Sequence, residues 1–238
     1  VVATGLRGRI MASIIRLSPP TEEEALSKPH YIYAEALDEP YAALALVERE
    51  QARLFEFLPQ ILDSVRADGA TKLDPDILVN AATAVVRQCG EFLTNILDNN
   101  SARDVLIDAI ELQKRNEIIV NLIAAVRDYV KIVGAGGLIS PGSKFGRLLF
   151  ALGESMHTIL SVANEAFLNR DSHDLDLLRE FTSDRSAQME RVRRQVMDVE
   201  DIGPAEHDML YASTTLFERT LWLLQRYTAL VDAANAAE

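Results

Sequence analysis

The feature that most constrains this chain is the stretch Ser101–Val133, which contains no glycine and no proline. Ser101 can accept a hydrogen bond from the backbone of Asp104 while the carboxylate of Asp104 reaches back, so a capping box is predicted at its start. At 1.5 Å per residue, one helix over this stretch is about 50 Å long. The glycine-rich run that follows is expected to end the helix at Gly134.

Glu117 and Asn121 lie four residues apart in the middle of this helix, on one face. An unpaired polar group inside an apolar helix costs a few kcal/mol, so both side chains need partners. Two interpretations stay open. One is a polar network completed by Lys114, Arg115 or an arginine of another helix, and the other is a site for a metal ion or an anion. The apolar neighbours are Ile118, Ile119, Val120, Leu122 and Ile123.

Local start signals predict five more long helices, so the expected fold class is all-α. Their openings are Asp38-Glu39-Pro40, Asp74-Pro75, Ser140-Pro141, Asp171 or Ser172, and Gly203-Pro204. Pro59 should kink the first of these helices, because its ring cannot continue an α-helix. Short turns between the helices force neighbours to run antiparallel, which predicts an elongated bundle of six long antiparallel helices.

The glycine-rich break at Gly134–Gly137 divides the six helices into three plus three. Ser101 precedes Glu117 by about as many residues as Gly203 precedes Glu218, so the two halves have a similar layout. We therefore predict a tandem pair of three-helix bundles. The first repeat would span 38–135 and the second 136–238, after an N-terminal segment and connector at 1–37.

The N-terminal segment is basic and amphipathic, with Arg7, Arg9 and Arg16 among apolar residues. It is either a helix packed on the body or a juxtamembrane segment, since lysine and arginine collect on the cytoplasmic side of membrane-spanning helices. Position 1 is valine, which suggests a piece cut from a longer protein. No apolar run reaches the roughly 18 residues that cross a bilayer. Thr21–Tyr33 is expected to be a surface loop.

Composition narrows the classes of function. A net charge of −12 repels phosphate backbones, so nucleic acid is not expected as a partner. The single cysteine, Cys89, excludes an intramolecular disulfide. No nucleophile or acid–base pair can be assembled from the sequence, so we do not expect an enzyme. The histidines form no close-spaced metal pair; they are His30, His157, His173 and His207.

This organisation resembles the PhoU family of bacterial phosphate-signalling regulators, whose fold consists of two three-helix repeats. A more specific likeness lies in the connector. It is similar to the segment that leads into the C-terminal PhoU-like domain of bacterial sodium/phosphate cotransporters. The residues that carry this likeness are Lys28-Pro-His-Tyr-Ile-Tyr33, then Leu37-Asp-Glu-Pro-Tyr-Ala-Ala-Leu-Ala45, and Glu50. The resemblance covers essentially the whole chain. It implies a transmembrane transport domain as the N-terminal partner and a location at the cytoplasmic face of the inner membrane.

PhoU proteins typically carry an acid-x-x-x-acid motif, or acid-x-x-x-Asn, whose carboxylates can hold metal ions. Glu117-Ile-Ile-Val-Asn121 matches this motif in the first repeat. Glu218 matches only its first position in the second repeat, because Trp222 cannot ligate a metal. The resemblance therefore implies a divalent or iron-type metal ion at Glu117, Asn121 and Glu218, and no other cofactor. Further candidate carboxylate faces are Glu91 with Asn95 and Asp98, and Asp184.

Two functions are consistent with these features. The first is a non-catalytic regulatory domain of a sodium-dependent phosphate transporter, in which an ion or a partner shifts the population of bundle arrangements. The second is a free-standing, metal-binding PhoU-type regulator of phosphate uptake and signalling. The many apolar helix positions also leave room for a homodimer.

Overall fold

The computed structural model describes residues 21–66, 69, 73–135, 143–169, 172–183, 190–191, 194 and 203–235. Helices make up most of this part of the chain, and it contains no strand. The all-α prediction is confirmed for the described residues. The predicted basic segment at Arg7, Arg9 and Arg16 and the predicted helix openings at Ser140-Pro141 and Asp171 lie outside them.

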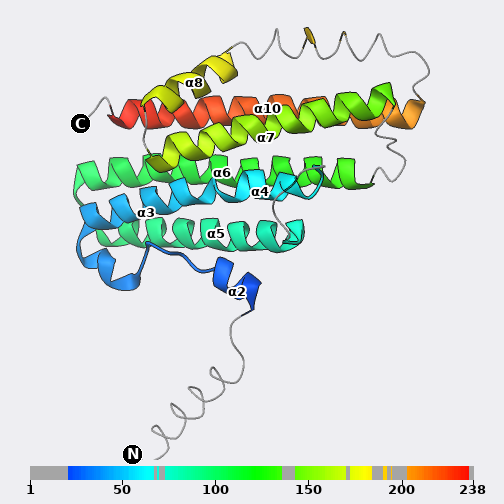
Figure 1. Ribbon diagram of the computed structural model, residues 1–238. Coiled ribbons are helices and arrows are strands. Elements are labelled where there is room, and N and C mark those ends of the chain that lie inside the picture. Colours follow the sequence, from blue (N-terminus) through cyan, green and yellow to red (C-terminus); the bar gives the residue numbers. More distant parts are fainter. Residues whose placement is uncertain are drawn as a thin grey trace, which may run out of the picture.

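The long segments follow one another in alternating directions, and α3 and α4 together form one interrupted segment (Figure 1). Their bounds are α3 (Pro40–Leu54), α4 (Phe57–Asp63), α5 (Pro75–Asn99), α6 (Arg103–Ala135), α7 (Lys144–Asn169), α8 (Ser172–Ser183) and α10 (Pro204–Asn235). Two short elements come before them, α2 (Glu22–Leu26) and the 3-10 helix η1 (Ala34–Asp38).

Three helices begin where the local signals predict, at Pro40, Pro75 and Pro204. Proline is well placed there, because the first helical turn has no intrahelical acceptor for its missing N–H. For α5 the cap is complete: the carboxylate of Asp74 accepts a hydrogen bond from the backbone N–H of Asp76 at 2.8 Å. These starts depend on only a few neighbouring residues, which is why the sequence alone predicts them.

The predicted capping box at the start of α6 is wrong. The helix begins at Arg103, and the carboxylate of Asp104 accepts a hydrogen bond from the hydroxyl of Tyr41 on α3. In the predicted capping box, the carboxylate of Asp104 would have accepted from the backbone of Ser101. In the structure it accepts instead from a residue of another helix. The end of the helix also differs, because α6 continues through Gly134 to Ala135.

Two other local predictions have different outcomes. Thr21–Tyr33 is not a simple loop, because Thr21 and Glu24 form a capping box that starts α2. Pro59 interrupts the first long helix as predicted. Because Pro59 has no N–H to donate to the carbonyl of Phe55, that carbonyl accepts from Leu58 instead, at 3.3 Å.

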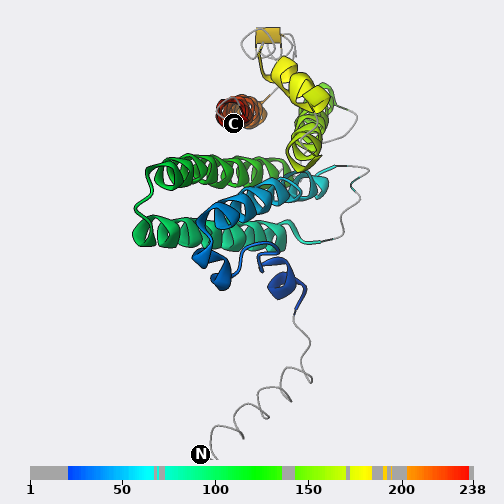
Figure 2. The same ribbon diagram turned by 90° about the vertical axis from the view of Figure 1, so that its left-hand side faces the viewer.

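The helices form two groups that cross each other. The segment α3–α4 packs with α5 and α6, while α7, α8 and α10 lie together on the other side of α6 and α4. Figure 2 shows α10 nearly end-on, whereas α5 and α6 still extend across the view. Helix α6 is therefore covered on one side by its own group and on the other by α10, with which it packs most extensively.

One hydrophobic core passes through both groups and contains buried residues of α4, α5, α6, α7, α8 and α10. At its centre three aromatic rings meet, from Phe55 at the break before α4, Phe167 of α7 and Tyr227 of α10. Their centroids are 4.6 to 4.8 Å apart in tilted and edge-to-face arrangements. The predicted repeat boundary falls at the end of α6, but the core is continuous across the two groups; the domain boundary stays a prediction.

Candidate functional site at the connector

The structure does not bury Glu117 and Asn121 together, and the expectation that an apolar helix encloses both is wrong. Glu117 is exposed, and Asn121 is half-buried. The amide nitrogen of Asn121 donates to the backbone carbonyl of Glu117 at 2.8 Å, and its amide oxygen accepts from Arg219 at 2.9 Å. An arginine of another helix is one of the partners that the polar-network interpretation named.

Glu218, the third predicted metal ligand, is half-buried on α10 beside Arg219. Trp222 is 42% exposed, and the guanidinium of Arg226 lies 5.5 Å from its ring centroid. Within the described residues, no group of three or more histidine, cysteine, aspartate or glutamate side chains is placed to hold a metal ion. The oxygen of Asn121 already faces a cation. Metal binding at Glu117, Asn121 and Glu218 stays a prediction.

The second carboxylate face proposed from the sequence, on α5, lies in solvent. Glu91, Asn95 and Asp98 are all exposed, and Glu91 makes a long contact of 3.5 Å with Arg87. Asp184 lies outside the described residues. This face is consistent with an ordinary solvated helix surface.

The buried polar residues of α6 are Arg115 and Asn116, which are 2% and 8% exposed. The amide of Asn116 donates to the carbonyl of Val86 on α5 at 2.9 Å. The sequence held a signal for them, since Arg115 is three residues after Leu112 and four before Ile119, on the same apolar face. The acid-x-x-x-Asn spacing instead marks Glu117, which lies on the exposed side of the helix.

A buried carboxylate on α3 holds the connector against the bundle. Glu50 is 0% exposed, and one of its oxygens accepts hydrogen bonds from the backbone N–H groups of His30 and Tyr31, each at 2.7 Å. The other oxygen accepts from Nε of Arg53 at 2.6 Å. The guanidinium of Arg53 also reaches the carbonyl of Lys28 at 3.4 Å. We call this arrangement of Glu50, Arg53 and residues 28–31 the connector clamp.

Both ions of the connector clamp are withdrawn from water, so each depends on the other. Removing one member of a buried pair leaves an uncompensated charge and costs about 3–5 kcal/mol. The clamp is extended on either side. The guanidinium of Arg49 lies 4.5 Å from the ring centroid of Tyr31, and the side chain of Gln88 on α5 donates to the carbonyl of Ser27 at 3.0 Å. The connector is therefore bound to two helices of the first group.

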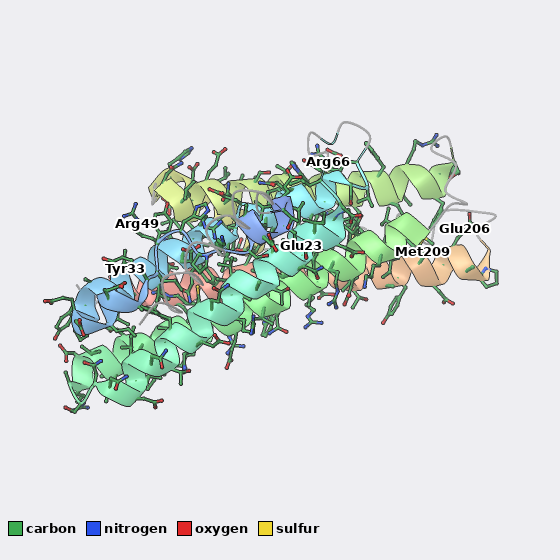
Figure 3. All side chains as sticks on the ribbon, turned by 90° about the horizontal axis from the view of Figure 1, so that it is seen from below. Glu23, Tyr33, Arg49, Arg66, Glu206 and Met209 are labelled. Atoms are coloured by element: carbon green, nitrogen blue, oxygen red, sulfur yellow. The ribbon has the colours of Figure 1, made fainter. Side chains whose placement is uncertain are left out.

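A second polar cluster joins α4 to α7. Nε and Nη2 of Arg66 donate to the two carboxylate oxygens of Glu154 at 2.7 and 2.8 Å. Nη1 of Arg66 donates to Asp63 at 2.9 Å, and Nε2 of His157 lies 3.2 Å from the same Asp63 oxygen. Figure 3 shows Arg49 and Arg66 separated along the length of the α3–α4 segment. This cluster borders a largely apolar cavity of about 800 Å³ between α4, α6 and α7.

The electrostatics of this second cluster favour a charged Glu154 and a neutral His157. The hydrogen bonds from Arg66 lower the pKa of the Glu154 carboxyl. Burial, and then the positive charge of Arg66, lower the pKa of His157, against the opposing effect of Asp63. On α5, burial raises the pKa of the Cys89 thiol to about 12, so Cys89 is not an activated nucleophile.

Comparisons with known proteins identify no relative of this chain. No family model matches it, and no curated protein or solved structure is detectably similar to it. In the part of the chain that the structure describes, no helix combines the length and the apolarity needed to cross a membrane.

Proposed function

We propose that this chain is a PhoU-like regulatory domain on the cytoplasmic side of a sodium-dependent phosphate transporter, and that it modulates phosphate transport without catalysing a reaction. The two groups of helices would be a tandem pair of three-helix repeats, with α3–α4, α5 and α6 in the first and α7, α8 and α10 in the second. The alternating helix directions and the connector sequence support this arrangement.

The connector clamp is the observation that carries the proposal. In the cotransporter family the connector leads from the membrane to the cytoplasmic domain, and here residues 28–31 are hydrogen-bonded to an ion pair that is almost fully buried. A segment fixed in this way moves with the helix that holds it. A displacement of α3 would therefore be transmitted to whatever precedes the connector.

The mechanism we propose is a population shift between arrangements of the two helix groups. The groups meet at the Arg66–Glu154 ion pair and at cavities, as well as through the shared core. A ligand that binds one arrangement better than another changes their ratio by its difference in affinity. Because α3 belongs to the first group and contacts α7, this change would reach the connector clamp.

A free-standing, metal-binding regulator is the alternative function. It has less support, because the amide oxygen of Asn121 is hydrogen-bonded to Arg219. Elemental analysis of the purified chain would separate the two. Stoichiometric metal that is lost in Glu117→Ala and Asn121→Ala would favour the alternative, and a metal-free protein unaffected by both changes would count against it.

Transport by the full-length protein tests the proposal. We expect sodium-dependent uptake of radiolabelled phosphate into cells that express it. Glu50→Gln, which weakens the connector clamp, should change the uptake rate several-fold while the dependence on sodium is kept, and Glu91→Gln on the exposed face of α5 should leave the rate unchanged. Circular dichroism would show that both variants fold. A full-length protein without membrane-spanning segments, or without sodium-dependent uptake, would contradict the proposal.

A further inference from the structure

Arg115 is a buried cation whose charge is only partly matched. Its Nη1 donates to the carboxylate of Glu48 on α3 at 3.0 Å, and its Nη2 donates to the backbone carbonyl of Leu230 on α10 at 3.0 Å. Its Nε is buried and, among the residues that the structure describes, has no hydrogen-bond partner. Leaving an N–H of a buried guanidinium unpaired is unfavourable, so the site lacks an acceptor.

The carboxylate of Glu48 does not fully compensate this charge. Its side chain is 31% exposed, whereas that of Arg115 is 3% exposed. Water screens a partly exposed carboxylate more strongly than a buried one, which weakens its attraction for the guanidinium. Arg115 therefore retains part of its capacity to attract an anion.

Arg115 lines a cavity of about 130 Å³ where the two helix groups meet. This space is large enough for a few water molecules or one small ion. Apolar side chains form much of the wall, among them Ala52, Phe167 and Leu175. Electrostatic interactions are stronger beside such a wall than in open water.

A second arginine lines the same cavity. Within the described residues, the guanidinium of Arg49 has no carboxylate partner and lies over the ring of Tyr31, which also lines the cavity. Two guanidinium groups and one carboxylate thus surround this space. Arg115 also borders a wider cavity, but that one is lined by Asp108 and Glu111, whose charges would repel an anion.

We propose that the cavity between Arg49 and Arg115 binds a small oxyanion. The planar fork of N–H groups on arginine matches two oxygens of a carboxylate, sulfate or phosphate. Arg66 shows this geometry within the same chain, since its Nε and Nη2 hold both oxygens of Glu154. At Arg115 the bound anion supplies the acceptor that Nε lacks. Protein atoms cover Nε in this conformation, so binding requires the side chain to turn this edge toward the cavity.

Binding of the anion would reach the connector clamp directly. Tyr31 lines the cavity, and its backbone N–H donates a hydrogen bond to the carboxylate of Glu50. The inference goes beyond the proposed function, because anion binding is a property of this chain whether or not a transport domain is attached to it. Binding to the chain and uptake by the full-length protein can therefore fail independently.

Titration of the purified chain with anions tests the proposal. Inorganic phosphate, sulfate and acetate would be added at constant ionic strength while the Nε–Hε resonance of Arg115 is followed by NMR. We expect a saturable shift of this resonance. Tighter binding of phosphate and sulfate would indicate a site for a tetrahedral oxyanion, and tighter binding of acetate would indicate a site for a carboxylate. Arg49→Met and Arg115→Met, followed by calorimetry, should weaken binding at least about tenfold, as expected for the loss of a charge-assisted hydrogen bond.

Two further variants make the result specific to the cavity. Arg127→Met removes a half-exposed arginine of α6 that pairs with Asp128 and does not line the cavity, so it should leave binding unchanged. Ala52→Leu fills the cavity while both arginines stay in place, and it should weaken binding even if Arg115→Met fails to fold. The proposal is overturned if none of the three anions gives saturable binding, or if Arg49→Met and Ala52→Leu both bind within twofold of the unmodified chain.

Discussion

Arg53 and Arg115 are buried to nearly the same degree, at 4% and 2% exposed, but their charges are matched differently. Arg53 pairs with Glu50, a carboxylate that is 0% exposed and whose two oxygens are both hydrogen-bonded. Arg115 pairs with Glu48, which is partly exposed, and its Nε has no partner. The first arginine belongs to a closed polar network, and the second to an open one.

This difference assigns the two sites different roles. A closed network of buried charges fixes the chain in one geometry, because every movement breaks a strong hydrogen bond. An open network beside a cavity can gain an interaction when a ligand of the right charge enters. The connector clamp therefore suits transmission of movement, and the Arg115 cavity suits detection of a ligand.

The largest effect on stability should come from the two buried arginines, Arg53 and Arg115. Replacing either one by methionine keeps much of the packing volume. Arg53→Met leaves Glu50 buried and unpaired, and we expect a loss of about 3–5 kcal/mol in the free energy of unfolding. Arg115→Met leaves the partly exposed Glu48, which water can solvate, so the loss should stay below about 2 kcal/mol. Urea denaturation measures both. Equal losses would remove the distinction between the two sites.

Arg66 provides an intermediate case. Both oxygens of Glu154 are paired with it, but the Arg66 side chain is 17% exposed and that of Glu154 is 35% exposed. Solvent screening reduces the effect of this ion pair, but Arg66→Met also removes the cation beside Asp63, whose side chain is only 8% exposed. We therefore expect a loss of roughly 2–3 kcal/mol in the free energy of unfolding. The same denaturation experiment applies, with Arg87→Met on the exposed face of α5 as the control. A loss as large as that of Arg53→Met would show that pairing, rather than burial, dominates.

The neighbouring His157 should make stability depend on pH. Its pKa in the folded chain is below the ordinary value of 6.5, so the unfolded chain binds more protons as the pH falls below that value. The free energy of unfolding should therefore decrease as the pH falls below about 6.5, by at most about 1.4 kcal/mol per pH unit for one proton. His157→Asn should flatten this part of the profile. Glu154, whose pKa is also lowered, acts in the same direction below about pH 4.5.

The smallest effect concerns the surface contact between Tyr41 and Asp104. The hydrogen bond from Tyr41 lowers the pKa of the Asp104 carboxyl. In Tyr41→Phe this pKa should return toward its ordinary value, as measured by NMR titration of the side-chain carboxyl carbon. An unchanged pKa would mean that the backbone N–H groups at the start of α6 hold the carboxylate by themselves.

The candidate site was less predictable than the helices. The connector resemblance had singled out Glu50, but no property of the sequence identified its partners, because His30 and Tyr31 lie 20 and 19 residues away along the chain. The sequence had suggested Arg115 only as a partner for Glu117 and Asn121. Its hydrogen-bond partners in the structure are Glu48 of α3 and Leu230 of α10, which lie 67 and 115 residues away along the chain.

The sequence by itself determined that this chain is helical in its described parts and where several helices begin, including those at Pro40, Pro75 and Pro204. These features depend on proline geometry and on hydrogen bonds within one turn, which involve only neighbouring residues. The tertiary structure decided which polar groups are buried, and that the buried polar side chains of α6 are those of Arg115 and Asn116, whereas Glu117 is exposed. The physical reason is that α6 packs with its own group and also with α10. Its periodicity marks the apolar face, but contacts with distant segments decide which polar side chains of the helix are covered.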